Sequence, residues 1–455
     1  MLKKLNSNKF LLYSSILGQV ATIVFTPFIT RLESKTQIGL YSIFFASVGI
    51  YTLVGAFRIE LGFVENATSS NKDKRDLGAV TSMLSLGTSL IFSLVIQAIY
   101  QDFTLSILTF FGCFLTINSI ICTYWTISEK DISKLVLFRF TKPIFIIFFQ
   151  LIFIALDVDK GLILGYDLGI LSSILFFRQK TFQFRIVDKK TFVSKLKQNI
   201  NFIKYSTPSD FMNSLGTQLP IFIFERMFGL EYSASYMYTQ RIVISPFAIL
   251  TESLSKTLFQ LYSLKEDINL LISQILSVQI KFYIAAFGGI LLFDELIVSI
   301  LFGDGWDEMG FLFKGSFFWV LSMFISVPVL SLLNITKNQR MELSFQTTLF
   351  AFRLSALLLG YFLDSFNSIF LIFCLASAIP YLLYFRKTLK ILSISIDTNE
   401  WFSIENILSI IVLLLLVFYV QIRISSSLNY VLSSIFVGLQ LFSTVRKFRK
   451  LNMDL

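Results

Sequence analysis

The feature that most limits how this chain can fold is a series of separate apolar runs, each about 20 residues long. A run of that length crosses the ~30 Å hydrocarbon layer of a membrane as an α-helix. About 14 such runs lie between residues 9 and 446, and 55% of the 455 residues are hydrophobic. Only 15% are charged, whereas soluble chains carry roughly 25%. The sequence therefore predicts an all-α, polytopic membrane protein.

The connections between the runs predict which side of the membrane each one faces. Most of their basic residues fall on the side that also holds the N-terminus. The connections on the opposite side hold only Arg31, Lys35, Lys160 and Arg423. Loops on the cytoplasmic side of a membrane are enriched in Lys and Arg. Both termini are therefore predicted to be cytoplasmic.

Polarity divides the chain into four parts. Six runs occupy residues 1–177, a basic connection follows at 178–204, six more runs occupy 205–390, and a final pair occupies 391–455. Because six is an even number, both six-helix groups enter the membrane in the same orientation, as in transporters built from two parallel repeats. Apolar residues recur at helical spacing within the basic connection, which predicts an amphipathic helix on the cytoplasmic surface.

Polar residues recur along one face of several runs. Asp210, Ser214 and Gln218 stand four residues apart, and Gln19 belongs to a similar series in the first run. Such spacing places side chains on one face of an α-helix. A polar face within hydrocarbon must meet protein or water. We expect these faces to line an aqueous cavity, although hydrogen bonding between helices is the alternative for any single residue.

Several cations lie deep within the runs. They are Arg353, Arg241, Lys142 and Arg58. A charge at the centre of a span costs at least ~2.5–3.5 kcal/mol unless water or a counter-charge relieves it. A cavity lined by cations attracts anions, and the planar guanidinium suits phosphate groups. Lys142 can alternatively extend to the membrane surface, and Arg58 can pair with Glu60.

Two acidic residues and two prolines complete the candidate site. Asp210 and Glu60 are the candidates for ion coupling, although Asp210 stands near a helix start, where a carboxylate often serves only as a cap. Pro246 follows Arg241 by five residues and loosens the backbone ladder there. Pro246 and Pro27 are the predicted hinges.

The sequence argues against an enzyme. It contains no GxxxxGK[ST] loop, HExxH or GxSxG motif, and no histidine. Its three cysteines have no metal-binding spacing, so we expect no cofactor and no metal. The net charge of +10 resides between the spans, which argues against nucleic-acid binding. Transport would therefore use H⁺ or Na⁺, the membrane potential or the gradient of the substrate.

Four stretches carry a resemblance to a known family. They read YSTPSDFMNSLGTQLPIFIFERMFGLEYSASYMYTQRIVISPF, TPFITRLESKTQIGLYS, KGLILGYDLG and LFGDGWDEMG. Together they resemble the Wzx-type oligosaccharide flippases, bacterial polysaccharide-biosynthesis proteins of the multidrug/oligosaccharidyl-lipid/polysaccharide exporter superfamily. The sequence departs from the family where Gln240 precedes the arginine, because alanine is common there.

The resemblance implies two six-helix bundles around a central cavity, working by alternating access in the bacterial plasma membrane. It implies export of undecaprenyl-pyrophosphate-linked repeat units for O-antigen, capsule or another surface polysaccharide. The residues standing where such flippases hold the pyrophosphate are Arg31, Arg58, Arg241 and Arg353. Membrane lipids, a polysaccharide polymerase and chain-length machinery are the further partners that this function implies.

Two other functions stay open at this point. A drug or organic-cation exporter of the same superfamily would need an acidic, aromatic cavity, whereas the deep charges here are mostly basic. A membrane enzyme of polysaccharide assembly, such as a polymerase or acyltransferase, would need a large outer loop or a histidine. The sequence shows neither of these two features.

Overall fold

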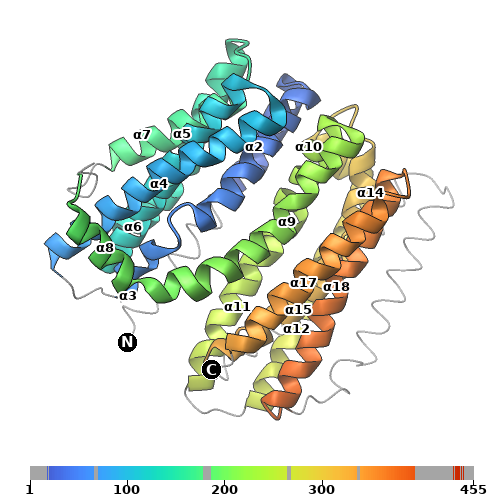
Figure 1. Ribbon diagram of the computed structural model, residues 1–455. Coiled ribbons are helices and arrows are strands. Elements are labelled where there is room, and N and C mark those ends of the chain that lie inside the picture. The colour runs from blue at the N-terminus through green and yellow to red at the C-terminus, as the bar shows by residue number, and fades with distance from the viewer. Residues whose placement is uncertain are drawn as a thin grey trace. The chain divides into compact units, whose positions relative to one another are not determined.

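The computed structural model describes residues 18, 20–65, 70–177, 186–263, 268–335, 339–394, 434, 436–440, 442 and 444. These residues form helices and their connections, and no strand occurs among them (Figure 1). The chain divides into two compact units, Met1–Met237 and Tyr238–Leu455. The predicted final pair of spans lies largely outside the described residues.

Eight helices in the described part of the chain are long and apolar enough to cross a membrane. They comprise Lys35–Val54 (α2), Asn71–Tyr100 (α4), Phe103–Ser128 (α5), Ile132–Ala155 (α6), most of Ile268–Leu292 (α12), Glu308–Gly315 with Phe317–Leu330 (α14 and α15), most of Gln339–Gly360 (α17) and Phe366–Ile391 (α18). Two shorter apolar helices are Val20–Leu32 and Gly161–Phe176 (α7). The prediction of an all-α, multi-pass membrane protein is confirmed.

Helix α4 shows how side chains are distributed in such a protein. Its serines at 82, 85, 89 and 93 are buried, whereas its leucines at 90 and 94 are exposed. The Ser82 hydroxyl donates to Oδ1 of Asn118 in α5 over 2.9 Å. Small polar residues between helices and large apolar residues outside are the arrangement expected in lipid.

One of the apolar runs covers residues 38–63 and predicts a single span, but the helix there is interrupted in the structure. Helix α2 ends at Val54, after which Phe57 and Arg58 have left-handed backbones with φ of 52° and 57°. A 3₁₀ turn, Ile59–Leu61 (η1), and a short helix, Gly62–Glu65 (α3), follow. A left-handed conformation costs a residue with a side chain about 1–2 kcal/mol. Neighbouring contacts must therefore hold this break in place.

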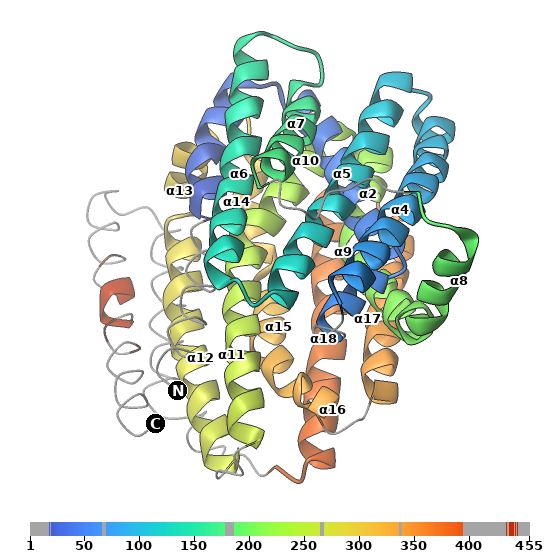
Figure 2. The same cartoon turned by 90° about the vertical axis from the view of Figure 1, so that its left-hand side faces the viewer.

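The basic connection contains the predicted helix, Lys189–Gln198 (α8). Asp188 caps it by accepting a hydrogen bond from the backbone N–H of Thr191 over 3.3 Å, and hydrogen bonding to Thr191 lowers the pKa of Asp188. Phe192 and Leu196 pack against a cluster that includes Val80 of α4 (Figure 2). The apolar face of α8 thus meets protein, and its contact with the membrane surface stays a prediction.

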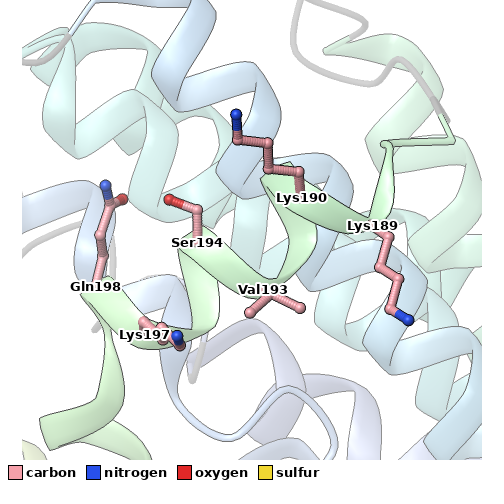
Figure 3. A pocket seen from close by; sticks show the side chains of 6 residues that line it. All are labelled: Lys189, Lys190, Val193, Ser194, Lys197 and Gln198. Carbon is pink, nitrogen blue, oxygen red and sulfur yellow. The ribbon is translucent and has the colours of Figure 1, made fainter.

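The other side of α8 is polar. A shallow depression there is lined by Lys189, Lys190, Val193, Ser194, Lys197 and Gln198 (Figure 3). Its three lysines are the basic surface that the sequence predicts for this connection.

The polar spans of the predicted second group begin with a π-helical turn, Phe202–Ser206 (η2), and the helix Thr207–Phe228 (α9). Gly229, with φ of 103°, leads into Leu230–Thr239 (α10). Unit 1 ends within α10, and α9 packs along α2 (Figure 1). The predicted boundary near residue 205 rests on chain topology and stays a prediction.

Unit 2 is a helical bundle with an aromatic core. Its remaining elements are a π-helical turn, Gln240–Ile244 (η3), and the helices Ser245–Ser263 (α11), Asp294–Leu301 (α13) and Leu332–Ile335 (α16). Phe247, Tyr283 and Phe324 have ring centroids 5.3–6.4 Å apart. The Tyr283 hydroxyl donates to the backbone carbonyl of Phe317 over 2.5 Å, which joins α12 to α15.

Candidate functional site

Unit 1 brings together three of the predicted site residues, Arg58, Glu60 and Asp210. Nε of Arg58 lies 2.7 Å from Oδ2 of Asp210 in α9, and its Nη1 lies 3.3 Å from Oε1 of Glu60. The cluster therefore links the end of α2 to the start of α9.

The charges of this cluster are largely shielded from solvent. The side chain of Arg58 is 19% exposed, that of Glu60 is fully buried, and that of Asp210 is 35% exposed. One cation thus faces two carboxylates, and removing it would leave Glu60 as a buried, uncompensated charge. A pyrophosphate at the Arg58 guanidinium would therefore meet two carboxylates beside it.

Both chain segments that carry the cluster depart from regular helix. Arg58 lies in the left-handed break after α2, and the π-turn η2 ends four residues before Asp210. The Thr207 hydroxyl donates to the carbonyl of Phe202 across that turn, over 3.1 Å. Strained backbone and π-helical turns are concentrated at functional sites. We therefore take the Arg58, Glu60 and Asp210 cluster as the candidate site of unit 1.

The rest of the polar stripe on α9 faces α2. The Ser214 hydroxyl donates to the carbonyl of Gly49 over 3.2 Å. The Gln218 side chain lies against the same glycine, where an added Cβ would come within 3.5 Å of it. We expected this stripe to line water. In this structure it meets α2, which is the other environment that a polar face within a membrane tolerates.

The other predicted residues of unit 1 lie apart along the chain. Nζ of Lys142 donates to the Ser119 hydroxyl over 2.8 Å and so joins α6 to α5. Arg31 is exposed near the end of the helix Val20–Leu32, and Pro27 lies within that helix. Gln19 lies outside the described residues. Their roles in substrate binding and hinge motion stay predictions.

Arg353 is enclosed within unit 2. It is 1% exposed, and its Nε donates to the Ser377 hydroxyl of α18 over 3.0 Å. Its guanidinium carbon lies 5.1 Å from the ring centroid of Trp319 and 5.7 Å from that of Phe373. These are cation–π distances. The predicted contact with substrate would require this packing to open.

Arg241 occupies a different environment in unit 2. It lies half-buried in the π-turn η3, and Pro246 is the second residue of the following helix α11. The backbone ladder is therefore irregular next to the predicted hinge proline. Both the hinge and the contact between Arg241 and substrate stay predictions.

Sequence reasoning missed one charged residue, Asp167 of α7. It is 4% exposed, and neither carboxylate oxygen has a hydrogen-bond partner among the described residues. The carboxylate packs against Gly112 of α5, where an added Cβ would lie 2.9 Å from Oδ1. Carboxylates within spans are rare and mark ion pathways or proton relays. An acid in the middle of the apolar stretch GLILGYDLGILSS was the available signal.

No protein-family model matches the sequence, and no curated protein matches it. Solved structures do match. The lipid II flippase MurJ in an inward closed conformation aligns with a TM-score of 0.70 at 14% identity, covering 99% of this chain and 100% of that one.

Two transporters of the MOP superfamily align less completely. An outward-facing multidrug resistance MATE family transporter gives a TM-score of 0.56 at 13% identity, covering 85% of this chain and 95% of its own. A transporter from Pyrococcus furiosus Vc1 gives a TM-score of 0.53 at 12% identity, again covering 85% of this chain and 95% of its own. The chain therefore has the fold that MurJ and the membrane transporters of this superfamily share.

Proposed function

We propose that this protein moves undecaprenyl-pyrophosphate-linked oligosaccharide units from the cytoplasmic to the outer leaflet of the bacterial plasma membrane. The observation that carries this proposal is the end-to-end alignment with a lipid II flippase, which covers 99% of this chain and 100% of that one. The MATE family transporter covers only 85% of this chain. A lipid-linked substrate is therefore favoured over a drug.

Alternating access would carry the substrate across. A substrate with two negative charges would gain ~2.3 kcal/mol per charge for every 100 mV on leaving an inside-negative cell. The buried carboxylate of Asp167 could add the H⁺ or Na⁺ coupling that the sequence leaves open. A polymerase with its chain-length machinery would then consume the exported unit.

Among the predicted cations, Arg241 is the pyrophosphate contact that we propose to test first. Arg353 is only 1% exposed and would have to leave its aromatic surroundings to reach a substrate. Arg241 is half-buried in a π-turn, where the backbone can adjust to a ligand. Guanidinium groups bind phosphate oxygens through two parallel hydrogen bonds.

The test measures lipid-linked repeat units on the inner leaflet of cells that lack this protein. Wild type and Lys256→Gln should clear the accumulated unit, and Arg241→Gln should not. Lys256 is a suitable control because it is exposed and, among the described residues, pairs with Glu252 of its own helix over 2.6 Å.

Each other result is informative. If the Arg241→Gln variant clears the repeat unit, Arg241 is not a substrate contact, while the proposed flippase function still holds. No accumulation in the deletion strain, with reduced tolerance to drugs, would replace the flippase proposal with the drug exporter.

A further inference from the structure

A polar cavity of ≈ 360 Å³ lies in unit 1 beside α8. It is lined by Gly62, Phe63, Glu65, Asp73, Lys74, Leu77, Lys195, Gln198 and Asn199. These residues come from α3, the start of α4 and the end of α8. Helices α4 and α8 are neighbours in Figure 2. None of them belongs to the Arg58, Glu60 and Asp210 cluster.

Lys74 is a buried cation with spare donors. It is 6% exposed, and its Nζ donates to the carbonyl of Ser128 over 3.5 Å. Ser128 is the last residue of α5, where a cation is favourable. That long contact uses one of the three ammonium hydrogens. Within the described part of the chain, the ion pair at this cavity joins Lys195 to Asp73 over 3.0 Å and leaves Lys74 out.

Asn199 supplies a buried acceptor to the same cavity. It is 2% exposed, and its Nδ2 donates to the carbonyl of Lys195 over 2.9 Å. Its Oδ1 has no hydrogen-bond partner among the described residues. An acceptor left in this way costs about 1–3 kcal/mol unless a ligand or water completes it. The lining of the cavity thus includes a buried lysine with spare donor hydrogens and an asparagine whose Oδ1, buried against Gly62, has no donor.

The charges around the cavity balance. Lys74 and Lys195 face Glu65 and Asp73, so an anion without a positive group would meet two carboxylates. A ligand with both a phosphate and an ammonium fits better, because each charge finds an opposite partner. The cavity also lies at the polar start of α4, just before its apolar stretch begins at Leu77. Lipid headgroups occupy that level of a membrane.

We propose that this cavity binds the headgroup of a phospholipid of the phosphatidylethanolamine class. The phosphate lies at Lys74, and the primary ammonium donates to Oδ1 of Asn199 and to the carboxylate of Glu65. Phe63 and Leu77 provide the apolar part of the lining. The bound lipid fastens α8 to α3 and α4, whatever substrate the protein transports.

The test places the purified full-length protein in phosphatidylcholine nanodiscs with added phosphatidylethanolamine or phosphatidylglycerol. Native mass spectrometry then counts retained lipids, and thermal unfolding gives the apparent Tm. Wild type should retain phosphatidylethanolamine preferentially and gain Tm from it. Lys74→Gln should lose both effects. Lys72→Gln removes the same charge from an exposed neighbour outside the cavity and should keep them.

Further variants and lipids test the proposal if Lys74→Gln fails to fold. If Lys74→Gln does not fold, Glu65→Gln, on an exposed side chain, should equalise the retention of phosphatidylethanolamine and phosphatidylglycerol. Equal retention of phosphatidylcholine by wild type would overturn the proposal, because a quaternary ammonium cannot donate a hydrogen bond. An equal Tm gain from soluble O-phosphoethanolamine would overturn the lipid as the source of the headgroup.

Discussion

Arg353 shows how a protein can hold a charge inside a helix bundle with ring faces and a hydroxyl. Trp319 and Phe373 flank its guanidinium, and Ser377 accepts from its Nε. Cation–π contacts in such desolvated places are worth about 2 kcal/mol. They offset part of the desolvation cost, which an apolar side chain of similar length would not incur. The geometry therefore favours a structural role.

That role predicts how two variants behave. Ser377→Ala should destabilise the protein by roughly 1–3 kcal/mol, because Nε loses its acceptor while it remains buried. Arg353→Met combined with Ser377→Ala should recover most of the loss in apparent Tm. A double variant less stable than Ser377→Ala alone would contradict the prediction. Loss of repeat-unit clearance in a stable double variant would return Arg353 to the substrate site.

For single residues, the sequence predicts how deep a charge lies within a span but not which side chains it contacts. Arg353 stands in mid-run, so hydropathy alone identifies it as a buried charge. Ser377 lies 24 residues away in sequence, and only helix packing brings the two together. Asp167 was missed because a single acid in an apolar run has no periodic pattern. Its unpaired state becomes visible only when α5 and α7 are packed.

Helices were predicted more reliably than their interruptions. Long apolar runs fix where spans lie, and α4, α5, α6 and α18 follow that pattern. The break after Val54 escaped prediction because the segment lacks proline, and because its charges, Arg58 and Glu60, also occur within membrane spans. Contacts far apart in sequence hold the break, above all the 2.7 Å approach of Arg58 to Asp210. The polar stripe of α9 was found, whereas its partner α2 was not.

The charge cluster of Arg58, Glu60 and Asp210 joins the end of α2 to α9, and we expect its variants to change the stability of the protein. Arg58→Gln should destabilise the protein by about 3–5 kcal/mol, because Glu60 is left as a buried charge. Adding Glu60→Gln and Asp210→Asn should restore much of the apparent Tm, since no charge is then unpaired. Thermal unfolding in detergent measures both. A triple variant as unstable as Arg58→Gln would show that the charges do not act as a unit.

At the scale of the whole molecule, the all-helical, multi-pass architecture could be predicted, and the fold agrees with it. The orientation of the spans stays a prediction. The contacts that a transport cycle would make and break could not be predicted, because they depend on close approach between helices. Gly39 of α2 is an example. An added Cβ there would lie 2.3 Å from the carbonyl oxygen of Leu230 in α10. Small residues permit such contacts between helices in membranes.

If the two predicted six-helix groups, 1–177 and 205–390, separate during alternating access, this contact between α2 and α10 opens in each cycle. The hydroxyls of Ser42 and Ser233 lie 2.9 Å apart there, close enough for a disulfide between cysteines at these positions. Oxidation of Ser42→Cys with Ser233→Cys should therefore stop clearance of the repeat unit, and a reductant should restore it. Either single cysteine variant should be indifferent to both treatments. If the cross-linked protein still clears the unit, α2 and α10 move as one body, and access alternates elsewhere.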